Sequence, residues 1–348
     1  MVGLAGAVTV NIKRMLKVNL NIGAGEHCLV LNDLPNASEL TGKSKIALKD
    51  MFDRTLLALK VFKICKRFLT DKTDFMTFIS RGVSGAEPPR DVAEAMRNYD
   101  AILMLTTHSL SHTDARRGAS NRGARIASMP GFNVRMLYPN GPMDVDYLDI
   151  SRQTKVLAEI GSEARRIRIE SADGTEFIFE KGSRPFIVDD GLYASKGRWG
   201  NLPAGEAYCA PIEGQAYGKL CVKKGWYPNL GEDMQIIVAD GLVGKVVGGG
   251  GVGNFLRRIL GFGKEAPDNL FIHRRNIAEF GVGTNPNAKR PDNILEAEKI
   301  KGTVHVALGD NIHFGGMNAA DIHLDFVYPY VSVWFDDRKI IDEGSWLI

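Results

Sequence analysis

The hydrophobic pattern of the chain changes near Pro142 and divides the sequence into two halves that obey different folding rules. Before Pro142, segments with helical periodicity alternate with short apolar segments, among them the continuous run AILMLTT at 101–107. Such a run suits a parallel strand that is buried on both faces. After Pro142, apolar and polar residues alternate, as in RRIRIESADGTEFIFEKG, whose Asp-Gly pair predicts a two-stranded hairpin.

Two domains follow from this change, an α/β domain at 1–143 and an α+β, mainly β domain at 144–348 that carries the site described below. A length of 348 residues is enough for two domains, each with its own hydrophobic core. The pattern also predicts helices near 44–67, 88–98 and 254–260, and a last hairpin around Asp336 and Asp337.

Composition limits the partners of the chain. Lys and Arg number 44 against 41 for Asp and Glu, which is too small an excess to indicate nucleic acid or an anionic membrane. We expect no membrane span and no secretory leader, and therefore a cytoplasmic protein that acts on a small molecule. The cysteines form no C-x-x-C pair and are expected to be buried apolar residues: Cys28, Cys65, Cys209 and Cys221.

Two glycine-containing segments resemble nucleotide-binding motifs only superficially. GGGGVG at 248–253 fits G-x-G-x-x-G but lies among predicted hairpins, so we interpret it as a turn between a strand and a helix. TGKS at 41–44 lacks the upstream glycine of a phosphate-binding loop, which places Lys43 on the surface.

Residue types that bind metal ions gather toward the C-terminus. His323 and Asp325 are two positions apart in an apolar strand pattern, so both face the same side and can converge on one ion. Each histidine alone could instead be a buried structural residue, and Glu206, which follows a Pro-Gly turn, could be a solvated turn residue. The clustering favours a metal site, and its candidate ligands are Glu206, Glu279, His305, His313, His323 and Asp325.

Four motifs, LPAGEAYCAP, NIAEFGVGTNP, GTVHVALG and IHLDF, resemble in this order the aminopeptidase T family of metal-dependent aminopeptidases. The resemblance implies a homodimer that holds two divalent ions, zinc, cobalt or manganese, through Glu206, Glu279, His305, His323 and Asp325. The tyrosine ligand of the family is replaced by Ile312, and the adjacent His313 could take its place only if the loop bends.

The resemblance further implies that the two ions activate a water molecule to cleave N-terminal residues from peptides, or to cleave a small amide. Glu298, just before the strand of His305, is the candidate general base or a residue that orients the site. A solvated glutamate at a helix end is the other reading of Glu298.

The ring-cleaving 2,5-dihydroxypyridine dioxygenases are similar to these peptidases and provide the main alternative. They bind one ferrous ion through two histidines and an aspartate. Because that group has histidine at the position of Glu279 and apolar residues at those of Glu206 and His305, the polar residues here favour the peptidase interpretation. A hydrolase of a non-peptide amide and a non-enzymatic, metal-stapled protein stay open. The basic loop 108–125 is either a substrate-binding segment or a connection between domains.

Overall fold

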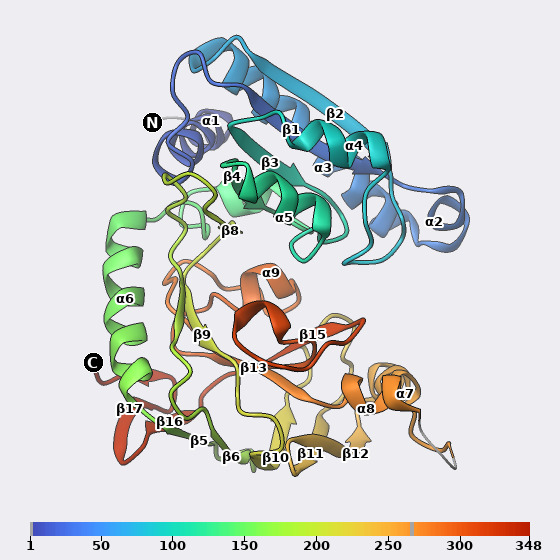
Figure 1. Ribbon diagram of the computed structural model, residues 1–348, viewed down its shortest axis with the longest axis vertical. Coiled ribbons are helices and arrows are strands. Elements are labelled where there is room, and N and C mark those ends of the chain that lie inside the picture. Colours follow the sequence, from blue (N-terminus) through green and yellow to red (C-terminus); the bar gives the residue numbers. More distant parts are fainter. Residues whose placement is uncertain (1–2, 265–267) are drawn as a thin grey trace. The chain divides into compact units, whose positions relative to one another are not determined.

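The computed structural model of this protein describes residues 3–264 and 268–348, which form two compact units (Figure 1). One unit contains Met1–Asp149 and Gly191–Ala204, and the other contains Ile150–Asp190 and Gly205–Ile348. The chain therefore returns to the first unit after it has begun the second.

The first unit contains a five-stranded parallel sheet with the order β2-β1-β3-β4-β8, so the α/β prediction for the N-terminal half is confirmed. The AILMLTT run supplies the central β3, whose five residues are all buried. The strands are β1 (Cys28–Leu34), β2 (Thr73–Ile79), β3 (Ala101–Leu105), β4 (Arg125–Ser128) and β8 (Trp199–Asn201). The helices of this unit are α1 (Leu4–Arg14), η1 (Met15–Asn19), α2 (Ala37–Gly42), α3 (Lys45–Phe68), α4 (Arg90–Met96), α5 (Asp114–Asn121) and η2 (Val134–Leu137).

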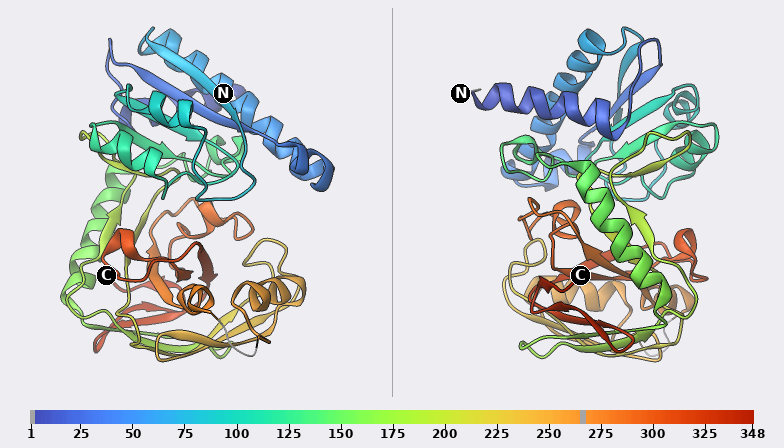
Figure 2. Two further views of the ribbon diagram at one scale, coloured as in Figure 1. Left: turned by 45° about the vertical axis from the view of Figure 1, so that its right-hand side comes forward. Right: turned by 90° about the vertical axis from the view of Figure 1, so that its left-hand side faces the viewer.

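Helices cover both faces of the parallel sheet because successive strand residues point to opposite sides. Cys28 contacts Cys65 of the long α3, which lies along the sheet in Figure 2. Leu29, the next residue, packs in a core with Met96 at the end of α4 and Ala119 of α5. All four cysteines are buried and free, as predicted.

The second unit contains two antiparallel sheets, which confirms the mainly β prediction for the C-terminal half. The eight-stranded sheet has the order β12-β11-β10-β6-β5-β16-β17-β18, and the five-stranded sheet has the order β15-β14-β13-β9-β7. Strands of the larger sheet are β5 (Arg166–Glu170), β6 (Glu176–Glu180), β10 (Ala216–Val222), β11 (Met234–Ala239), β12 (Leu242–Gly248), β16 (Ser332–Phe335), β17 (Arg338–Asp342) and β18 (Ser345–Trp346). Those of the smaller sheet are β7 (Ile187–Asp189), β9 (Glu206–Cys209), β13 (Ile277–Gly283), β14 (Val304–Gly309) and β15 (His323–Tyr328).

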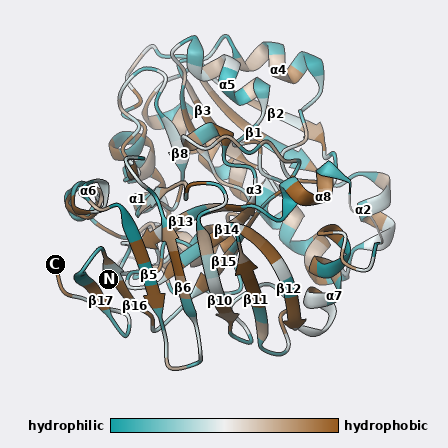
Figure 3. Cartoon of the chain, turned by 60° about the horizontal axis from the view of Figure 1, so that its bottom comes forward, coloured by the Kyte–Doolittle hydropathy of each residue, from teal (hydrophilic) through white to brown (hydrophobic). Residues whose placement is uncertain are grey.

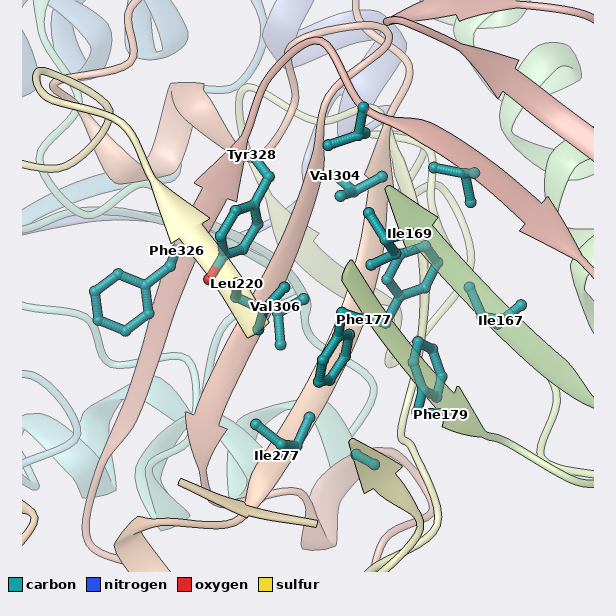
Figure 4. Packing of buried hydrophobic residues seen from close by; sticks show 14 of the residues in the cluster. Ile167, Ile169, Phe177, Phe179, Leu220, Ile277, Val304, Val306, Phe326 and Tyr328 are labelled. Carbon is teal, nitrogen blue, oxygen red and sulfur yellow. The ribbon is translucent and has the colours of Figure 1, made fainter. Parts of the chain in front are cut away.

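The main core of this unit lies between the two sheets. Figure 3 shows apolar residues recurring along β5, β6, β10, β11 and β12. On β5, Ile167 and Ile169 are buried while Arg166 is exposed, so one face of the larger sheet is apolar. Side chains from both sheets meet in Figure 4: Ile167, Ile169, Phe177, Phe179 and Leu220 from the larger sheet, and Ile277, Val304, Val306, Phe326 and Tyr328 from the smaller one.

Turns and helices of the second unit match several sequence predictions. The hairpins β5–β6 and β16–β17 form as expected, the first around Asp173 and Gly174. The glycine-rich segment ends β12 and begins α7, with Gly249 in the left-handed region at φ 77°, and β12 pairs with an antiparallel neighbour. The segment is therefore a strand-to-helix turn outside any parallel βαβ unit. The helices are α6 (Tyr147–Glu163), which begins at the end of the first unit, α7 (Gly250–Ile259), α8 (Asn269–Arg274), α9 (Ile294–Ala297) and η3 (Ile312–Phe314).

Among the residues that the structure describes, no helix combines the length and the apolar character that crossing a membrane requires.

Candidate metal centre

The candidate centre lies on one face of the five-stranded sheet, opposite the face that packs in the core. Alternate residues of a strand share a face, and directly paired residues of neighbouring strands do so as well. On β13, Glu279 and Gly281 therefore point to the same side, and the strand pairing places His305 opposite Gly281. Ala307 on β14 pairs with both Glu279 and Asp325. The polar residues of three strands consequently converge on this face.

The intervening residues of the same strands point into the core. Phe280 on β13, Val306 on β14 and Phe326 on β15 are each at most 1% exposed and belong to the large hydrophobic cluster. Burial of this apolar face fixes the register of the strands, because a shift of one residue would turn every side chain to the other side. The packing of the core therefore positions the polar cluster.

Glu279 is the centre of the polar cluster. Its Oε1 lies 3.2 Å from Nε2 of His305, and its Oε2 lies 3.3 Å from Nε2 of His323. His323 Nε2 is also 3.4 Å from Oδ1 of Asp325, as the two-residue spacing in the strand predicted. Glu206 on β9 joins from the other side, with its Oε2 3.4 Å from His305 Nε2. The structure thus brings five of the predicted residues together.

Three of these residues form a compact ligand set. Within the described part of the chain, Glu279, His323 and Asp325 are the group whose donor atoms all lie within 4.8 Å of one another. Donors bound at about 2.1 Å from a common ion lie about 3.0–3.4 Å apart, which matches the nitrogen-to-oxygen distances in the cluster. The carboxylate and imidazole donors fit a divalent metal ion.

Small residues leave room for the histidine of β14. A methyl group at Gly281 would lie 2.2 Å from both Cε1 and Nε2 of His305, and that ring is 1% exposed. Because a bonded carbon cannot approach a ring so closely, the imidazole occupies the space that a side chain at 281 would need.

Replacement of Gly281 by alanine is expected to push the imidazole of His305 away from Glu279 and to destabilise the second unit by about 1–3 kcal/mol. Chemical denaturation measures the loss of stability, and histidine NMR signals report the displacement of the ring. Gly251→Ala on α7 is the matched control, since a methyl group there meets nothing within 4 Å. An unchanged His305 signal in Gly281→Ala would contradict this interpretation.

A backbone contact orients His323. Its Nδ1 lies 2.8 Å from the carbonyl oxygen of Asp310, and since a carbonyl can only accept, Nδ1 is the donor. Nε2 of the neutral ring then carries the lone pair and faces the carboxylates. The tautomer required for a metal ligand is therefore fixed by the fold.

The loop that supplies this carbonyl is itself held by Glu213. The carboxylate of Glu213 accepts hydrogen bonds at 2.8 Å from both the Asn311 side chain and the Met317 backbone, and pairs with Arg184 at 2.6 Å. Burial opposes its ionisation, but the bond from Arg184 and the backbone donors lower the pKa of Glu213 to about 2. Glu213 therefore stays charged and anchors the segment after β14.

The electrostatics of the cluster favour positive charge at its centre. Burial disfavours a charged imidazole, yet the hydrogen bond with Glu279 and the charge of Glu206 raise the pKa of His305 to about 9. Asp325 and Glu279 likewise raise the pKa of His323 well above its usual value against the effect of burial. Burial raises the pKa of Glu279, but its bonds with the two histidines more than offset this and lower it below its usual range. Protons and a metal cation would compete for these donors.

A buried lysine completes the cluster and was not anticipated from the sequence. Nζ of Lys299 donates to Oε1 of Glu206 at 2.6 Å and to Oε2 of Glu298 at 2.9 Å, and its side chain is fully buried. Burial raises the pKa of Glu298 to about 8, against the pull of the neighbouring ammonium. No motif marks Lys299; its one signal is its place beside a glutamate just before the strand of His305.

The remaining predicted ligand lies apart from the compact group. His313 is in η3, where its Nε2 is 3.9 Å from Oδ2 of Asp310. Ile312, at the position of the family tyrosine, is 49% exposed. Coordination by His313 stays a prediction.

Comparisons with known proteins place this geometry among two groups of enzymes. The sequence model of the NicX family, described as 2,5-dihydroxypyridine 5,6-dioxygenase, matches residues 10–347. A characterised 2,5-dihydroxypyridine 5,6-dioxygenase of Pseudomonas putida is 24% identical over 262 residues, which cover 70% of this chain and 71% of the relative.

Two solved structures share the fold. The 2,5-dihydroxypyridine dioxygenase from Pseudomonas putida superimposes with a TM-score of 0.74 at 17% identity, covering 100% of this chain and 98% of the other. Wild-type AmpT from Thermus thermophilus gives a TM-score of 0.63 at 13% identity, covering 99% and 100%. At these identities the superpositions establish the fold alone.

Proposed function

This chain belongs to the 2,5-dihydroxypyridine 5,6-dioxygenase family, and on that premise we propose that it is a ring-cleaving dioxygenase with one ferrous ion at Glu279, His323 and Asp325. The observation that carries the proposal is the family match over residues 10–347, which spans both units. The substrate is a small dihydroxylated nitrogen heterocycle of the 2,5-dihydroxypyridine class.

The predicted membership of the aminopeptidase T family is wrong, and so are the aminopeptidase activity, the peptide substrate and the classification as a metalloprotease. The family match and the characterised relative are both 2,5-dihydroxypyridine dioxygenases, while AmpT is a more distant structural neighbour. The physical reason is that the four motifs lie on β9, β13, β14 and β15, the strands of one shared sheet. They identify a metal-binding fold and do not distinguish hydrolysis from oxygenation.

The glutamate at 279 was the main argument against an oxygenase, and the geometry weakens that argument. The expected oxygenase pattern has two histidines and one carboxylate. Here the second imidazole, that of His305, lies on the neighbouring strand 3.2 Å from Glu279. His305, His323 and Asp325 therefore bring the same donor types to one cluster, which supports the proposal.

An iron ion, when bound, would supply the redox chemistry that lets dioxygen react with an aromatic ring. The chain holds the ligands on packed strands, fixes the tautomer of His323 through the Asp310 carbonyl and keeps bulk water away from the buried carboxylates. Glu298, with its pKa raised to about 8, can keep a proton at neutral pH and exchange it at Oε2 with the Lys299 ammonium. We assign Glu298 to proton transfer on this basis.

The test is reconstitution without oxygen. Metal-free protein loaded with Fe²⁺ is expected to consume oxygen and 2,5-dihydroxypyridine in equal amounts, because a dioxygenase places both oxygen atoms in the product. A chelator is expected to abolish the reaction, and Zn²⁺, which has no redox chemistry, is expected to bind without restoring it. An oxygen electrode and the loss of substrate absorbance are the measurements.

Cleavage of aminoacyl anilides by the zinc-loaded protein, with no oxygen uptake by the iron-loaded form, would contradict the proposal. Oxygen uptake that needs no substrate would contradict it as well, because it would indicate uncoupled oxidation of the ion.

A further inference from the structure

The buried ion pairs of Lys299 are the feature that the proposed chemistry leaves unexplained. A lysine side chain that is 0% exposed is rare, because burial of an ammonium is costly unless anionic partners surround it. Here Glu206 and Glu298 approach Nζ at 2.6 and 2.9 Å from two different segments, β9 and the end of α9. The ammonium therefore bridges two carboxylates as a bound cation would.

The position of this ammonium is informative because Glu206 faces both ways. Its Oε1 accepts the bond from Lys299, while its Oε2 lies 3.4 Å from His305 Nε2 and has no hydrogen-bond partner in the described part of the chain. Glu206 and His305 would be the natural ligands of a second metal ion beside the compact group. They do not form a compact group of three with Glu279, although each lies next to the cluster.

We propose that the ammonium of Lys299 takes the place of a second metal ion and restricts the centre to one divalent ion. The inference rests on the proposed metal site at Glu279, His323 and Asp325, and it assigns Glu206 to the lysine instead of to a metal. Lys299 is thus a positioning residue that determines how many ions the centre holds.

Charge balance supports this role. Four carboxylates, those of Glu206, Glu279, Glu298 and Asp325, are at most intermediate in exposure and lie in contact within one cluster. One divalent ion and the lysine supply three positive charges, whereas two divalent ions and the lysine would exceed the four negative charges. Without the lysine, Glu206 and Glu298 would face each other as unpaired buried anions, which a second cation would neutralise.

The experiment measures metal content in the full chain. Metal-free protein is titrated with Mn²⁺ by calorimetry, and the bound metal is counted by mass spectrometry after gel filtration. We expect about one ion per chain in the wild type and about two in Lys299→Met, which removes the charge at similar volume. Lys301→Ala is the control, because Lys301 is exposed and contacts Gln153, and it is expected to keep one ion.

Glu206→Gln keeps the test decisive if Lys299→Met does not fold. A glutamine that only replaces the partner of the lysine leaves the count at one, whereas loss of a metal ligand lowers it. Two ions in the wild type, a lower count in Glu206→Gln, or one ion in a folded Lys299→Met would overturn the inference. Oxygen uptake with 2,5-dihydroxypyridine, measured separately, decides the proposed function, so a two-ion protein that still cleaves the ring would refute only the role of Lys299.

Discussion

Replacement of His323 by alanine is expected to lower the metal content from one ion to almost none and to abolish ring cleavage. His323 is the imidazole ligand of the compact group, and its Nε2 lies 3.3 Å from Glu279 and 3.4 Å from Asp325. Its loss leaves two carboxylates close together with no nitrogen donor between them. We expect an affinity loss above the roughly 10- to 100-fold that removal of an outer partner causes.

Two further variants separate ligand loss from general damage. His27→Ala removes an exposed histidine of the first unit and is expected to change neither metal content nor turnover. Asp325→Asn keeps the shape of a second ligand but removes its charge, and is expected to weaken metal binding as well. His323→Ala protein that retains a full complement of iron, measured by mass spectrometry after gel filtration, would show that this side chain is not a ligand.

The strand face of the centre was predictable from the sequence because it follows from local geometry. The two-residue spacing of His323 and Asp325 implies a shared face, and both side chains lie together in β15. The alternating pattern around His305 likewise predicted a strand with its histidine opposite two buried valines. A period of two residues is encoded within a few positions, so no knowledge of distant contacts was needed.

Features that depend on distant contacts were not predictable. β8, inside the second half of the sequence, pairs with β4 of the parallel sheet, and no local pattern marks that return. Lys299 meets Glu206 across 93 positions of the chain. The motif resemblance failed for a related reason: ligand-bearing strands are shared by enzymes with different reactions, and the chemistry depends on how neighbouring strands combine their donors.

The core side of β13 provides a second large effect. Phe280 stands between Glu279 and Gly281 but points into the core, where it is fully buried. Its ring lies 5.3 Å from that of Phe179, and it also contacts Phe186 and Phe335. Phe280→Ala removes these contacts and leaves a cavity, which is expected to cost about 3–5 kcal/mol.

In a unit of this size each kcal/mol lowers the midpoint of thermal unfolding by about 2–4 °C, so calorimetry should show a fall of about 6–20 °C for Phe280→Ala. Phe255→Ala on α7 is the matched control, because Phe255 is 43% exposed and its loss is expected to cost less than about 1 kcal/mol. Metal affinity is expected to fall together with stability in Phe280→Ala, since the same strand carries Glu279 on its other face. Lost stability with unchanged metal affinity would mean that the ligands are held by β14 and β15 alone, and that the packing of β13 does not position the centre.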